Sequence, residues 1–139
     1  LAGVALAMKS ANPAIRVIGV TMERGCAMHA SLQAGKPVQV EEVASLADSL
    51  GGGIGLDNRY TFRMVRSLVD ETVLVTEEAI ADAIRHAYRE EQLVLEGSGA
   101  VGIAALLSGR VEPGETAVIM ASGANIDMTL HQQLVCAAA

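Results

Sequence analysis

Apolar residues recur at the spacing of an α-helix in six parts of the chain. In the first of them, Leu1, Val4, Ala5 and Met8 fall on one face, and Asn12-Pro13 ends the pattern. Each pattern predicts an amphipathic or buried helix. The predicted helices cover 1–11, 25–34, a segment after residue 57, a segment after residue 76, 98–108 and 127–135.

Polar residues mark where two of these helices begin. Asp57 or Asn58 is expected to cap one helix, and Thr76 the next, with Glu77 and Glu78 placed favourably against the helix dipole. The buried side of the first is expected to consist of Phe62, Val65, Leu68 and Val69. The buried side of the second is expected to consist of Ile80, Ile84, Ala87 and Tyr88.

Short apolar runs between the helices predict β-strands at 16–20, 72–75 and 116–121, of which the last is the clearest. The run 92–95 is ambiguous between strand and turn. Strands alternating with helices are typical of an α/β protein with a parallel sheet. We therefore expect a single α/β domain of helix and sheet layers.

Two of the apolar runs end in glycine beside a polar side chain. Residues 116–121 are followed by Ser122-Gly123-Ala-Asn125, and residues 92–95 by Glu96-Gly-Ser-Gly99. Ligands of open α/β sheets bind at the carboxyl ends of the strands. The sequence therefore predicts one shared small-molecule cleft lined by both segments.

Composition narrows the function further. The net charge is −6, aromatic residues make up only 2%, and no basic cluster is present, which argues against nucleic acid and anionic membranes as partners. No apolar stretch is long enough to span a bilayer and no secretory signal is visible. Cys26 and Cys136 are expected to be buried free thiols of a cytoplasmic protein. The chain opens at Leu1 inside a helical pattern, which favours a fragment of a longer polypeptide.

Three glycines allow an alternative interpretation. Gly97, Gly99 and Gly102 match the G-x-G-x-x-G fingerprint of dinucleotide-binding oxidoreductases, but the expected acid after the next strand is missing. The glycines could instead serve close helix packing, or a related cofactor role at the same strand end, and both are favoured over the dinucleotide fingerprint. The glycine-rich residues 51–55 are more typical of a flexible loop than of a phosphate cradle, and His29, His86 and His131 are expected to be surface or hydrogen-bonded residues rather than ligands.

The order of several short motifs resembles the serine/threonine dehydratases, which are pyridoxal-phosphate enzymes of the tryptophan-synthase-β fold type. Within them, residues 22–25 and 48–57 look most like the dehydratase branch of hydroxyectoine and ectoine breakdown. The resemblance runs along nearly the whole chain but implies only the carboxyl-terminal part of such an enzyme. The expected fold is then one partial domain over residues 1–139, a three-layer sandwich with at least three parallel strands. The matching motifs are Leu1-Ala-Gly-Val-Ala5, Leu46-Ala-Asp-Ser49, Thr76-Glu-Glu78, Glu96-Gly-Ser-Gly-Ala100 and Ser122-Gly-Ala-Asn-Ile-Asp127.

The resemblance implies a role for each matching residue. Ser122 would face the pyridine nitrogen of the cofactor, Gly123 would let the backbone approach the ring, and Glu96 would lie close to the ring. Ser49 would belong to the cofactor-binding set and Asp48 to the substrate pocket. Ala124 stands where the family usually has a second glycine.

The resemblance also implies what this chain lacks. The lysine that bonds to the cofactor would lie upstream, because neither Lys9 nor Lys36 matches its position. The acidic residues that bind a divalent metal in some relatives are missing from 21–27, so no metal is expected.

The implied reaction is the dehydration and deamination of threonine, serine or a related β-hydroxy amino acid to a 2-oxo acid and ammonia. The parent enzyme would act as a homo-oligomer, and the fragment alone would be inactive. A non-catalytic remnant remains the third interpretation, beside the dinucleotide-binding domain.

Overall fold

A computed structural model describes residues 1–137 of the chain. Its two strands, β1 (Ile18–Met22) and β2 (Glu71–Val75), pair in parallel, with Val20 opposite Val73 and Met22 opposite Val75. The remaining elements are α1 (Ala2–Ala11), α2 (Ala27–Ala34), η1 (Asp48–Leu50, a single 3-10 turn), α3 (Thr61–Leu68), α4 (Glu77–Arg89), α5 (Gly97–Leu107) and α6 (Met128–Cys136).

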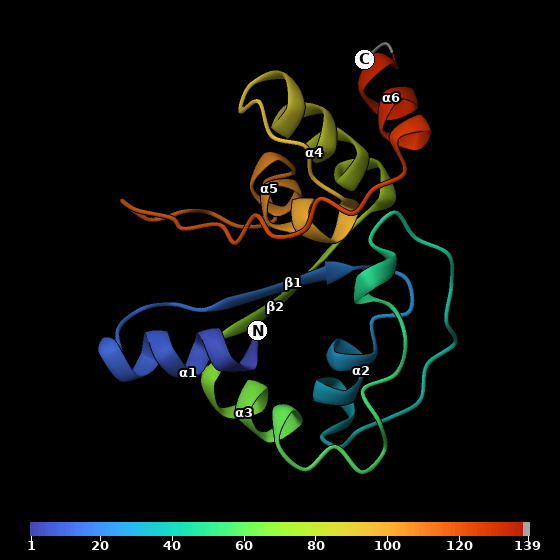
Figure 1. The fold of residues 1–139 in the computed structure, drawn as a ribbon. Coiled ribbons are helices and arrows are strands. Elements are labelled where there is room, and N and C mark those ends of the chain that lie inside the picture. The colour runs from blue at the N-terminus through green and yellow to red at the C-terminus, as the bar shows by residue number, and fades with distance from the viewer. Residues whose placement is uncertain (138–139) are drawn as a thin grey trace.

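The helices form a layer on each side of the strand pair. Figure 1 shows α1, α2 and α3 on one side and α4, α5 and α6 on the other. Small side chains allow the close approach of α4 and α5, since Ala83, Ala87, Ala100 and Ala104 are fully buried between them and the sheet. The predicted α/β class, with a small parallel sheet between helices, is therefore confirmed.

Local signals set the helix boundaries much as the sequence predicts. Thr76 caps α4, its hydroxyl accepting a hydrogen bond from the Ala79 amide at 3.1 Å. Asn58 accepts from the Phe62 amide at 2.9 Å just before α3. Gly35 ends α2 in the left-handed conformation that favours glycine.

Asp70 ties α1 to the segment that enters β1. Its carboxylate accepts hydrogen bonds from Lys9 Nζ at 2.9 Å and from the Val17 amide at 2.7 Å. The bond from Lys9, followed by that from Val17, lowers the pKa of Asp70 below its ordinary value of 3.8.

The prediction of a third strand at 116–121 is wrong within the described residues, where the sheet has two strands. The segment is not paired in a β-ladder. The Ala121 and Ser122 amides instead donate to carbonyls two residues earlier, at 3.2 and 3.1 Å. Ile119 packs on the core while Val118 is 85% exposed, because none of the described residues forms a strand next to it.

Smaller predictions also need correction. Tyr88 is 47% exposed rather than part of the buried side of α4, and residues 92–95 form a connection, with Gln92 at a φ of 57°. Both cysteines are free as expected, but Cys136 is exposed. His131 is 2% exposed and its Nε2 has no hydrogen-bond partner among residues 1–137, whereas the sequence predicted a surface or hydrogen-bonded histidine.

Candidate functional site

Three segments far apart in the sequence meet at the start of α5. They are the turn at residues 122–123, the helix start at 96–99 and the loop at 45–50, and we call them together the α5 site. The Glu96 amide donates to the Gly123 carbonyl at 3.1 Å, which joins the first two segments. The loop at 45–50 joins them because η1, which lies within this loop, contacts α5. The predicted shared location of Glu96 and Ser122-Gly123 is thus observed, although neither segment follows a paired strand.

Gly123 is the point of closest approach in this site. It has a φ of 94°, in the region that favours glycine, and a Cβ atom there would overlap the Glu96 carboxylate. A side chain at residue 123 would therefore both strain the turn and displace Glu96. Glycine at this position keeps a carboxylate within van der Waals contact of the turn.

The glycines of α5 serve protein packing. A Cβ atom at Gly97 would overlap the Leu46 carbonyl, and one at Gly99 would overlap the Ser122 carbonyl. A Cβ atom at Gly102 would lie 2.6 Å from a methyl group of Ile119. Protein atoms fill the space next to each of these glycines, so the geometry favours close packing over a cradle for a dinucleotide pyrophosphate.

Two hydroxyl groups at the α5 site form no hydrogen bond to another of the described residues. Ser122 is exposed, and its side chain makes no hydrogen bond to another of the described residues. The Ser98 hydroxyl is shielded from solvent and has no partner within residues 1–137. Sequence reasoning missed Ser98, although a serine between two glycines at a helix start was a visible signal.

Asp48 and Ser49 lie exposed in η1, where the Ser49 hydroxyl is 3.4 Å from an Asp48 carboxylate oxygen. The loop before them is held from α4. Glu77 accepts hydrogen bonds from the Ser45 hydroxyl at 2.6 Å and from the Leu46 amide at 2.7 Å. The sequence assigned Glu77 only to the helix dipole, because its partners lie about thirty residues earlier in the chain.

The lysines and the acidic residues lie elsewhere. Lys9 in α1 pairs with Asp70, which directly precedes β2, and Lys36 follows α2 on the surface. Neither lysine therefore belongs to the α5 site. Among residues 1–137, no group of three or more His, Cys, Asp or Glu side chains is arranged to hold a metal ion. None of the described helices combines the length and apolar character needed to cross a membrane.

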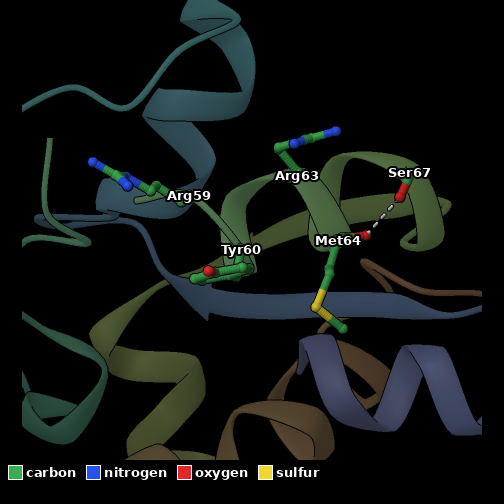
Figure 2. A pocket seen from close by; sticks show the side chains of 5 residues that line it. All are labelled: Arg59, Tyr60, Arg63, Met64 and Ser67. Atoms are coloured by element: carbon green, nitrogen blue, oxygen red, sulfur yellow. Dashed lines mark hydrogen bonds between the residues drawn. The ribbon is translucent and has the colours of Figure 1, made fainter. Parts of the chain in front are cut away.

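A shallow hollow elsewhere on the surface has a different lining. It measures about 340 Å³ and is lined by Arg59, Tyr60, Arg63, Met64 and Ser67 around α3. Figure 2 shows Arg63 and Met64 extending from α3 in opposite directions. None of the predicted site residues takes part in it.

The start of α5 thus combines a carboxylate, an unpaired hydroxyl and a glycine turn. With the helix layers around the parallel strands, these features indicate an α/β protein with a candidate cofactor site. Comparison with known proteins agrees with this class. The chain belongs to the family of pyridoxal-phosphate dependent enzymes, whose profile matches residues 1–123.

The most similar curated relatives include threonine dehydratases. The chain is 59% identical over 135 residues to a Sinorhizobium fredii protein provisionally named a threonine dehydratase, covering 96% of this chain and 41% of the relative. It is 40% identical to the L-threonine ammonia-lyase of Thermotoga maritima, covering 97% of this chain and 33% of the relative. The chain thus spans less than half the length of these relatives.

Solved structures give the same result. The processed form of threonine deaminase isoform 2 from Solanum lycopersicum has a TM-score of 0.84 and 35% identity, over 96% of this chain and 37% of that one. Maize serine racemase has a TM-score of 0.82 and 34% identity, over 95% of this chain and 41% of that one. The predicted partial fold and the predicted cofactor class, pyridoxal phosphate, are confirmed.

Proposed function

We propose that the polypeptide containing this chain is a pyridoxal-phosphate dependent ammonia-lyase. Its substrate is a small β-hydroxy amino acid such as threonine or serine, and its products are a 2-oxo acid and ammonia. The observation that carries the proposal is the contact of Glu96 with Gly123, which sets a carboxylate against the turn that carries Ser122. The threonine dehydratases among the relatives support the reaction class.

The residues present fit the cofactor. When bound, pyridoxal phosphate supplies the electron sink that makes the α-proton of an amino acid acidic. Ser122 would donate a hydrogen bond to the ring nitrogen as a neutral partner, and Gly123 would keep the backbone close enough for that contact. Glu96 would lie beside the ring, and Ser49 would complete the cofactor-binding set from the loop at 45–50.

Asp48 acts on the substrate side. Its exposed carboxylate follows the buried Ala47, so it stands at the edge of the α5 site rather than inside the core. A carboxylate there is able to orient the ammonium or hydroxyl group of a small amino acid. The lysine that bonds to the cofactor comes from a part of the enzyme outside residues 1–139, because both lysines of this chain lie elsewhere.

The enzyme works in the cytoplasm as a homo-oligomer and binds neither nucleic acid nor membrane. The exposed apolar side chains of Leu1, Val118 and Met120 support contacts with further polypeptide, both the rest of the same chain and a second copy. Sedimentation of the complete gene product tests the oligomer, and a monomer at micromolar concentration contradicts it.

The finer proposal is that the enzyme belongs to the branch of hydroxyectoine and ectoine breakdown. Residues 22–25 and 48–57 support it. The test compares kcat/KM for threonine and serine with that for the hydroxylated diamino acid released when hydroxyectoine is hydrolysed. A preference for threonine or serine contradicts the branch but leaves the reaction class intact.

The main experiment assays the complete gene product with threonine and with serine for oxo acid formation in the presence of pyridoxal phosphate. Ser122→Ala is expected to lower kcat by about tenfold or more, since a donor is lost beside the ring. Ser108→Ala, at the far end of α5, serves as the control. Absence of oxo acid from the cofactor-loaded wild type would overturn the proposal.

A further inference from the structure

The loop that carries Asp48 and Ser49 belongs to the longest connection in the chain. Residues 35–60 link α2 to α3, and within them only η1 forms a regular element. Connections of this length without structure of their own are uncommon in compact domains and need anchoring. The position of Asp48 therefore depends on what fixes the loop.

Glu77 provides that anchor. One carboxylate oxygen accepts from the Ser45 hydroxyl at 2.6 Å and the other from the Leu46 amide at 2.7 Å. Within residues 1–137, no other side chain outside this connection forms a hydrogen bond to 39–54. Hydrogen bonds to a charged acceptor are the stronger kind.

Ser45 passes this restraint along the loop. While its hydroxyl donates to Glu77, its oxygen accepts from the Ala47 amide at 3.0 Å. Leu46 then turns its carbonyl against the Cα of Gly97 at the start of α5, and Ala47 is fully buried. Two side chains thus fix three consecutive residues directly before Asp48.

We propose that Glu77 is a positioning residue of the α5 site. By clamping Ser45 and Leu46, it holds η1, with Asp48 and Ser49, against α5 and thereby determines the affinity for substrate. The effect of Glu77 on substrate affinity, which we call the substrate half of the inference, rests on the proposed function. Its effect on the position of the loop rests only on the contacts described above.

The charge and the geometry of Glu77 can be separated by substitution. Glu77→Ala removes both acceptors. In Glu77→Gln the amide oxygen can still accept from Leu46 and the amide N–H can donate to the Ser45 oxygen, so the clamp survives without charge. Glu78→Ala is the matched control, because Glu78 lies in the same first turn of α4 but is exposed and forms no hydrogen bond to the loop.

The first readout is amide hydrogen exchange at residues 45–50 in the complete gene product, which requires no activity. Glu77→Ala is expected to raise exchange by about tenfold or more, while Glu77→Gln and Glu78→Ala stay near the wild type. Should Glu77→Ala fail to fold, Ser45→Ala removes one bond of the clamp and is expected to raise exchange in the same residues. Unchanged exchange, or equal effects of Glu77→Gln and Glu77→Ala, would overturn the clamp.

The second readout separates positioning from general stability. Glu77→Ala is expected to raise KM for threonine by about tenfold, with kcat and the visible absorbance of the bound cofactor changed less than about twofold. Raised exchange with an unchanged KM overturns the substrate half alone. A wild-type enzyme that makes no oxo acid overturns the proposed function, and exchange still decides whether Glu77 holds the loop.

Discussion

The carboxylate of Glu96 occupies the space that a side chain at Gly123 would need. The same two residues are joined by the hydrogen bond from the Glu96 amide to the Gly123 carbonyl. The start of α5 and the turn before α6 are therefore fixed to each other through backbone as well as side chain. Changes at either residue should disturb the α5 site before they disturb the core.

Gly123→Ala tests this contact. The alanine meets the Glu96 carboxylate and must adopt a φ near 94°, so we expect a loss of about 1 to 3 kcal/mol in the free energy of unfolding. Cofactor retention by the complete gene product should fall as well. Urea unfolding and visible absorbance measure the two effects. Gly114→Ala, where nothing lies within 4 Å of the new Cβ, is the control, and an equal loss there would contradict the prediction.

Replacing either of two helical glycines by alanine is expected to change the free energy of unfolding, but in opposite directions. Gly99→Ala places a methyl group on the Ser122 carbonyl and should destabilise by about 1 to 3 kcal/mol. Gly3→Ala meets open space in α1 and should stabilise by up to about 1 kcal/mol, since alanine favours the helix. Thermal unfolding of both variants decides this, and a stabilising Gly99→Ala would show that the turn lies elsewhere.

The sequence predicted those features whose cause is local. Thr76 and Gly35 each act within a few residues of a helix end, and the helix predicted from residue 127 begins where Asp127 caps α6 through the Leu130 amide at 2.9 Å. The glycines next to Glu96 and Ser122 drew attention to two segments that do meet in the fold, because close approach of backbone needs glycine.

Features that depend on distant partners were missed or misassigned. Residues 116–121 have the composition of a strand, but a strand also needs a neighbour that the described residues do not supply. Tyr88 has the right spacing for burial, yet α6 covers only its edge through His131, with ring centres 5.1 Å apart. The role of Glu77 required the fold, since its partners precede it by more than thirty residues.

Asp70 should make stability depend on acid pH. The pKa of Asp70 in the folded state is lowered, chiefly by Lys9, so near pH 3.8 the folded state binds fewer protons than the unfolded state. Its contribution is fully present above the unfolded value of 3.8 and is lost as the pH falls through the folded pKa. Asp70→Asn should therefore be less stable at neutral pH, with the difference from wild type shrinking below pH 3.8.

Urea unfolding at neutral pH and at several values between about pH 5 and 2 tests the Asp70 prediction. The control is Asp57→Asn, an exposed aspartate outside the contact with Lys9. A difference between wild type and Asp70→Asn that stays constant over this range would show that the contact with Lys9 does not stabilise the fold.

Two arginines of α4 hold the far end of α6. Arg89 donates to the Val135 carbonyl at 2.5 Å and Arg85 to the Leu134 carbonyl at 3.4 Å. These carbonyls lie in the last turn of the helix, where a positive charge also offsets the helix dipole. Because α6 directly follows the Ser122 turn, weaker docking of α6 should loosen that turn too.

Arg89→Met keeps much of the side-chain length but removes the donors, and we expect it to cost about 0.5 to 1.5 kcal/mol. Hydrogen exchange should rise in α6 first and in residues 122–126 next, while α1 stays protected. Arg63→Met, on the exposed side of α3, is the matched control. If exchange rises in α6 but not in residues 122–126, the turn is held by Glu96 alone, and α6 serves only to cover the core.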